Sequence, residues 1–218
     1  MAIICTAVRK NSDFGEKRMN NYYLSEHIAL LERVFSFAYQ HKYALKVVEK
    51  EVSYSSFFQS IEKRDYFSAF IDDGSLIKNI FHVSNFDLMQ TPTYNQCLWA
   101  AEAYLRIQEK TKLTFEAIFL YIPISKMYDY FPLFHEMDFI QIVDEFKRLY
   151  FNQSVLNILL TSYNYSLKYV SEILSLPYDS LYSYKTRRRD IKKISGEASY
   201  LLASLFHVRI ETLLELHI

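Results

Sequence analysis

The sequence predicts a mainly α-helical protein. Glycine occurs only three times and proline four times in 218 residues, so the chain lacks the turn residues that many short strands need. Half of the residues are apolar, and many of them recur at the three- and four-residue spacing of amphipathic helices. A chain of this length can bury a sizeable core, in one large domain or two small ones.

The helical pattern divides the chain into an N-terminal helical region (1–90), a middle helical region (91–150) and a C-terminal region (151–218). In the first region, the segment 44–52 fits either a helix or a short strand, and Asp72–Ser75 predicts a turn. No low-complexity linker separates the three regions, so we expect them to pack together.

The middle region predicts a series of helices. A strong amphipathic pattern runs from Cys97 to Gln108, and Thr114 is placed to cap the helix that follows. We expect Pro132 to interrupt a later helix, because proline lacks the backbone N–H that a helix interior uses. A last helix is expected from about Met137 to Tyr150.

The C-terminal region predicts five short helices. Ser166 is placed to cap the second, whose Val170 and Ile173 are expected to face the core, and Leu181 is the buried anchor of the third. A brace helix, a tight break and a short presented helix make up the arrangement that a helix-turn-helix uses to place one helix in the major groove. This region therefore predicts a helix-turn-helix domain.

Polar side chains of the presented helix would then reach base edges, and nearby cations would contact phosphates. The whole chain has no net formal charge, yet residues 185–193 hold six basic residues and one acid, Asp190. The side chains expected at base edges are Tyr178, Asp179, Tyr182 and Ser183. The side chains expected at phosphates are Lys168, Lys185, Arg187, Arg188 and Arg189.

The same region resembles the Cro and lambda-repressor family of XRE-like helix-turn-helix proteins. The matching elements are Ser166, Val170, Leu174, Ser175–Pro177, Leu181, Tyr184, Lys185, Arg187–Arg189, Leu201–Val208 and Ile210–Leu214. The resemblance implies a repressor-like transcription regulator that binds double-stranded DNA as a homodimer. The sequence departs from the family at Leu167 for a glutamine, Ser171 for an alanine, Ser175 for the turn glycine and Pro177 for the usual cap.

A second resemblance concerns the rest of the chain. Arg9–Gly15 resembles a stretch of small bacterial ADP-ribosyltransferase-like proteins, although the upstream His-Gly pair and the following Gly-Phe-Tyr of that family are missing. The middle region from Trp99 to Val143 is similar to small helical proteins often encoded beside those enzymes. Together these resemblances imply a toxin–antitoxin or mobile-element setting without catalysis.

Other classes of function lack the residues that they require. The three glycines are far apart, which argues against a phosphate-binding loop, and no Gly-x-Ser-x-Gly motif is present. His135-Glu136 has Phe139 where a zinc motif needs a second histidine, and the two cysteines have no partner at metal-ligand spacing. We expect no catalytic residue, no metal and no cofactor.

The sequence also predicts a soluble, cytoplasmic protein. The longest apolar region, from Phe115 to Phe134, is interrupted by Glu116, Lys126 and Asp129, and a membrane span needs about 20 mostly apolar residues. The two widely separated cysteines fit a reducing compartment.

Two functions remain open from the sequence. The first is a sequence-specific DNA-binding transcriptional regulator, antitoxin-like or from a mobile element. The second is a non-enzymatic protein-interaction module that neutralises a partner protein, such as a toxin or a host factor. In the second case the helix-turn-helix is kept for packing or dimerisation.

Overall fold

The first part of the fold is a helical body. The computed structural model describes residues 23–65, 73–82 and 94–216. The body contains a helix over residues 23–40, α2 (Leu45–Tyr54), α3 (Ser56–Glu62), α4 (Asp73–Phe81), α5 (Tyr94–Thr111), α6 (Phe115–Tyr121) and α7 (Ile124–Phe134).

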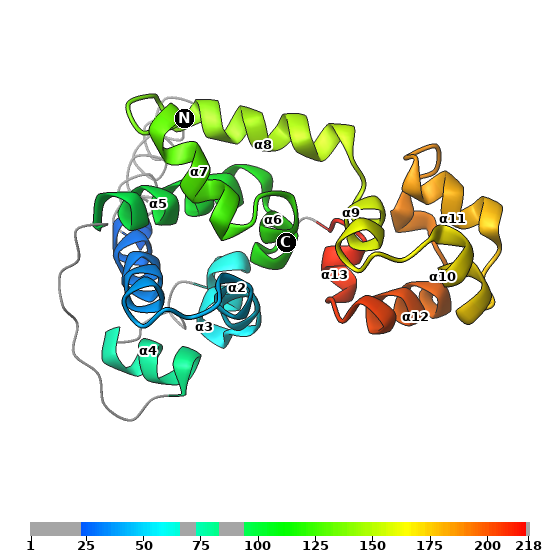
Figure 1. Cartoon of the computed structure of the whole chain (residues 1–218), viewed down its shortest axis with the longest axis horizontal. Coiled ribbons are helices and arrows are strands. Elements are labelled where there is room, and N and C mark those ends of the chain that lie inside the picture. The colour runs from blue at the N-terminus through cyan, green and yellow to red at the C-terminus, as the bar shows by residue number, and fades with distance from the viewer. Residues whose placement is uncertain (1–22, 66–72, 83–93, 217–218) are drawn as a thin grey trace, which may run out of the picture.

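The second part is a group of shorter helices at the C-terminal side of the chain, reached through the long helix α8. Helix α8 spans Ile140–Asn152, and the group after it comprises α9 (Val155–Ser162), α10 (Leu167–Ile173), α11 (Tyr178–Lys185), the 3₁₀-helix η1 (Ile191–Lys193), α12 (Gly196–Phe206) and α13 (Ile210–Leu213). In Figure 1 the body lies on one side, α9 to α13 lie on the other, and α8 runs along the top between them. Within the described residues every regular element is a helix, so the expected mainly α-helical fold is confirmed.

The short helix α6 is the centre of the molecule. It packs against α2 and α5 of the body, against α8, and against α9 and α13 of the C-terminal group. Its residues are apolar on almost every side, and six of its seven are buried. A helix that is apolar all round belongs inside a core, so α6 connects the two parts of the fold through one continuous core.

Side-chain caps begin several of these helices as the sequence predicts. The Thr114 hydroxyl accepts a hydrogen bond from the backbone N–H of Ala117 at 3.1 Å and so caps α6. Thr114 also lies 2.8 Å from the hydroxyl of Thr212 in α13. The capping residue of α6 therefore also joins the body to the C-terminal group.

The interruption predicted at Pro132 is wrong, because α7 continues through this proline to Phe134. A proline at this position leaves the carbonyl of Tyr128, four residues earlier, without its helical donor. The side-chain amide of Gln96 in α5 donates to that carbonyl at 3.2 Å. A neighbouring helix thus supplies the hydrogen bond that the proline removes.

Three other details of the sequence prediction are settled by the fold. The segment 44–52, which fitted a helix or a strand, lies in α2 apart from its first residue, which precedes the helix. The turn predicted at Asp72–Ser75 is wrong for residues 73–75, which begin α4, while Asp72 lies outside the described residues. Ile173 was expected to face the core but is 52% exposed.

A largely buried arginine ties the C-terminal group to the body. Arg209, which precedes α13, donates to both carboxylate oxygens of Glu62 in α3, with both distances 3.0 Å. The Glu62 carboxylate also accepts the backbone N–H of Phe115 at 2.6 Å, and Glu116 accepts the backbone N–H of Arg209 at 2.9 Å. Glu62 is fully buried, so these donors replace the water that its charge would otherwise need.

Candidate nucleic-acid interface

Helices α10 and α11 pack against each other across a four-residue connection, Leu174 to Pro177. The hydroxyl of Ser166 caps α10 by accepting the backbone N–H of Tyr169 at 3.0 Å. Val170 in α10 is fully buried, and Leu181 in α11 is 1% exposed. Each helix therefore has a buried anchor on the side that faces the core.

The connection has a defined backbone conformation. Ser175 is left-handed, with φ of 52°, a conformation that favours glycine. The backbone N–H of Leu176 donates to the carbonyl of Ser171 at 3.0 Å, which closes the end of α10. The Ser171 hydroxyl donates back to the Leu176 carbonyl at 2.6 Å. Ser171 therefore holds the connection by its backbone and by its side chain.

The inner face of α11 is fixed from the side of α9. Tyr184 and Leu181 are buried, and α11 packs against α9. The hydroxyl of Ser154 accepts the backbone N–H of Asn157, which caps α9, and donates to the carbonyl of Lys185 at 2.8 Å. One serine thus begins α9 and ends α11.

The outer face of α11 carries two exposed tyrosines. Tyr178 is 47% and Tyr182 is 39% exposed, and their rings are stacked with centroids 6.3 Å apart and planes 16° apart. The guanidinium of Arg188 lies over the ring of Tyr182 at 5.5 Å. We call these three side chains the tyrosine ladder. Asp179 is exposed on the same helix, and the half-buried Ser183 donates to the Asp179 carbonyl at 2.8 Å.

Positive charge is concentrated around this helix. Residues 166–193 contain seven of the chain's 25 basic residues but only three of its 25 acidic residues. Arg189, Lys192 and Lys193 are exposed beyond α11, and Arg189 lies over the ring of Tyr184 at 5.3 Å. Lys168 is exposed on α10 and lies 3.8 Å from Glu172 in a weak surface pair.

Arg187 belongs to the same basic run, but its guanidinium is engaged with the interior. Its Nη2 atom lies 2.9 Å from Oε1 of Glu215, and its Nε and Nη2 atoms both donate to the carbonyl of Gln153. Its guanidinium also lies over the ring of Tyr150 at 4.8 Å and donates to the hydroxyl of Tyr121. Burial alone lowers the pKa of Arg187, but the Glu215 carboxylate and its other partners outweigh burial and raise that pKa, so the guanidinium stays charged.

The structure thus separates the nine side chains predicted for DNA contact into three groups. Ser183 and Lys185 are half-buried, and Arg187 is engaged with the interior. The side chains that remain are exposed, and they are Lys168, Tyr178, Asp179, Tyr182, Arg188 and Arg189.

Sequence reasoning missed the residues that hold this surface in place. The partners of Arg187 lie far along the chain, with Glu215 at 28, Gln153 at 34 and Tyr121 at 66 residues' distance. No local spacing links such residues. Ser154 was also missed, although a serine before the apolar run of α9 is a recognisable cap signal.

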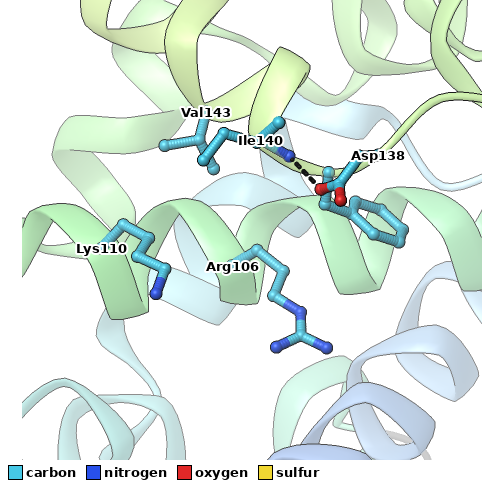
Figure 2. Close-up of a pocket in the computed structure, with 6 residues that line it drawn as sticks. Arg106, Lys110, Asp138, Ile140 and Val143 are labelled. Carbon is cyan, nitrogen blue, oxygen red and sulfur yellow. Dashed lines mark hydrogen bonds between the residues drawn. The ribbon is translucent and has the colours of Figure 1, made fainter.

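A separate hollow of about 430 Å³ lies in the body, between α5 and the start of α8. Figure 2 shows Arg106 and Lys110 extending from α5 on one side, with Asp138, Ile140 and Val143 on the other. Arg106 pairs with Glu102 at 3.1 Å and lies 3.8 Å from Glu109. Because acids accompany the cations, the hollow favours neither sign of ligand charge.

In the part of the chain that the structure describes, no group of three or more histidine, cysteine, aspartate or glutamate side chains is placed to hold a metal ion. No helix among the described ranges has the length and apolar character needed to cross a bilayer. The motif Arg9–Gly15 lies outside the described residues.

Comparison of this chain with protein-family models, with curated proteins and with solved structures finds no match. The exposed face of α11 and the cations around it are therefore what points to a nucleic-acid interface.

Proposed function

We propose that the chain is a non-enzymatic, sequence-specific DNA-binding transcriptional regulator of the repressor or antitoxin kind. Helix α11 enters the major groove of double-stranded DNA, with Tyr178, Asp179, Tyr182 and Ser183 toward base edges. Lys168, Lys185, Arg188 and Arg189 lie along the phosphates. The regulator acts in the cytoplasm as a homodimer, because two copies related by a two-fold axis match two half-sites.

The observation that carries this proposal is the exposed tyrosine ladder beside a surplus of positive charge. Helix α11 lies in the C-terminal group, on the side away from the body in Figure 1. Its buried side is held by α9 and α10, so the outer side is presented on a fixed support. A short anchored helix with flanking cations meets the requirements of groove readout and phosphate contact.

Salt-titrated binding to the DNA upstream of the protein's own gene tests the proposal. We expect the logarithm of affinity to fall linearly with the logarithm of salt concentration, because phosphate contacts release counterions. Arg188→Ala should reduce the slope by about one. The matched control is Arg148→Ala, which removes an arginine of 60% side-chain exposure from α8 and should leave the slope unchanged. Binding that does not depend on salt, or equal effects of the two variants, would contradict the proposal.

Base readout is tested by competition with a scrambled duplex of the same composition. Tyr182→Ala should lower the preference for the upstream sequence by about tenfold, as expected for one lost base contact. Tyr200→Ala removes an exposed tyrosine from α12 and should leave that preference unchanged. Equal losses for both variants would mean that Tyr182 has no part in readout.

The protein-interaction module remains a second candidate because apolar side chains are exposed on the body. Leu133 is 64%, Met137 is 53% and Ile140 is 49% exposed at the connection of α7 and α8. A neutralising partner bound there would make function sensitive to Leu133→Glu and insensitive to Arg188→Ala. The DNA proposal predicts the opposite pattern, so the two variants distinguish the candidates.

A further inference from the structure

The carboxylate of Glu215 collects three donors from distant parts of the chain at one oxygen. Its Oε1 atom accepts from the backbone N–H of Val155 in α9 at 3.0 Å, from the hydroxyl of Tyr121 in α6 at 3.0 Å, and from Arg187 at 2.9 Å. Glu215 itself is only 4% exposed. We call Arg187, Glu215 and Tyr121 the arginine clasp.

The clasp acts on the chain directly beside the proposed DNA surface. Arg187 lies two residues after α11 and directly before Arg188 and Arg189. Its backbone is left-handed, with φ of 56°, so the chain changes direction at this residue. The side-chain contacts of Arg187 therefore hold the point from which the two exposed arginines start.

The contacts of the clasp are suited to holding the Arg187 side chain in one position. Burial, together with the neighbouring carboxylate, raises the pKa of Tyr121 well above its ordinary value, so its hydroxyl keeps its proton and donates. The guanidinium of Arg187 meets a carboxylate, a carbonyl and an aromatic face, and lysine does not reproduce this set of contacts because it lacks the planar fork.

From these contacts we infer that Arg187 is a positioning residue of the DNA interface and that Glu215, far from α11 in sequence, controls DNA affinity through it. This inference rests on the proposed function. Arg187 contributes no phosphate contact. It orders Arg188, Arg189 and the end of α11 before DNA is bound, so its loss adds an ordering cost to binding but leaves their phosphate contacts in the complex.

A substitution of Glu215 distinguishes positioning by the clasp from a simple effect of net charge on DNA binding. Glu215→Gln removes a negative charge, which by itself favours binding to DNA. If the clasp positions the interface, Glu215→Gln instead weakens binding by about tenfold with an unchanged salt slope, within the range seen for mutations that act through another residue. Glu211→Gln is the matched control because it makes the same charge change at an exposed position of α13, four residues earlier in the chain. It should bind as tightly as the wild type or slightly more tightly.

The experiment measures salt-titrated affinity for the upstream duplex and hydrogen exchange of residues 186–193 in the free protein. Arg187→Ala should weaken binding without changing the salt slope, whereas Arg188→Ala should lower the slope by about one. Exchange in 186–193 should be faster in Glu215→Gln than in Glu211→Gln. Thermal unfolding followed by circular dichroism identifies any variant that fails to fold. If Arg187→Ala fails to fold, Arg187→Lys replaces it.

Two results would overturn the inference while leaving the proposed function intact. One is a slope reduction in Arg187→Ala equal to that in Arg188→Ala, and the other is equal affinity of Glu215→Gln and Glu211→Gln. If the wild type shows no salt-dependent binding, the proposed function fails, and the inference fails with it. Hydrogen exchange then still decides whether the clasp orders residues 186–193.

Discussion

Ser175 occupies a backbone conformation that favours glycine. Its φ of 52° lies in the left-handed region, where a side chain costs roughly 1 kcal/mol relative to glycine. The residue is exposed, and its backbone N–H donates to the carbonyl of Glu172 at 3.3 Å, so it completes the end of α10 without a packing role for its side chain. The strain at this position is therefore separable from the contacts around it.

We expect Ser175→Gly to raise the free energy of unfolding by up to about 1 kcal/mol, because glycine relieves the left-handed strain. Chemical denaturation measures this change. Ser204→Gly is the control, since Ser204 is an exposed residue within α12 and glycine there should destabilise by roughly 1 kcal/mol. Destabilisation by both substitutions would show that Ser175 is not strained.

At the scale of the element, one hydrogen bond from α5 compensates for the proline inside α7. Pro132 removes the donor that Tyr128 would normally receive within α7, and Gln96 of α5 supplies one. A buried carbonyl without a donor costs about 1–3 kcal/mol. The proline is tolerated in the helix because the neighbouring helix compensates for it.

This dependence predicts a measurable coupling. Gln96→Ala should lower the free energy of unfolding by about 1 kcal/mol in the wild type and by clearly less in a Pro132→Ala background, because alanine restores the helical donor at that position. A double-mutant cycle of urea denaturation curves gives the coupling energy. Identical effects of Gln96→Ala in the two backgrounds would rule out the compensation.

Helix starts are predictable from this sequence to a greater extent than helix ends. Thr114 and Ser166 mark the starts of α6 and α10, and each accepts the backbone N–H that a cap accepts. Helices commonly end at a left-handed glycine, but the nine described residues with positive φ are all of other types, including Ser175 and His207. The usual signal for an end is therefore missing from the sequence.

The candidate interface, too, is predictable from the sequence only in part. The exposure of Tyr178 and Tyr182 follows from helical periodicity and is observed, although their contact with DNA remains a prediction. The inward direction of Arg187 could not be predicted, because it depends on Glu215 and Tyr121 meeting in the folded chain. The boundaries near residues 90 and 150 also remain predictions.

At the scale of the whole molecule, the C-terminal group is tied to the body by Arg209. This side chain is 16% exposed and meets Glu62, which is fully buried, through two parallel hydrogen bonds. Burial alone lowers the pKa of Arg209, but Glu62 and Glu116 outweigh burial and raise that pKa, so the guanidinium stays charged. Removing one partner of such a pair leaves an uncompensated buried charge.

We expect Arg209→Met to lower the free energy of unfolding by about 3 kcal/mol, and the double variant Arg209→Met, Glu62→Gln to recover part of that loss. Guanidinium chloride denaturation measures both. The exposed pair of Arg148 and Glu145 provides the control, because water screens it and Arg148→Ala should have a much smaller effect. A loss of similar size in both arginine variants would mean that burial of Glu62 adds nothing.

The concentration of cations at α10, α11 and η1 separates charge along this electrically neutral chain. Residues 166–193 hold a surplus of four positive charges, and the remainder of the chain holds an equal surplus of negative charges. Near any negatively charged surface the molecule experiences a torque before it makes contact, and the end with α11 turns toward that surface. Such alignment should shorten the search over orientations, and we expect a cation-exchange resin to retain the protein although its total charge alone would leave it in the flow-through.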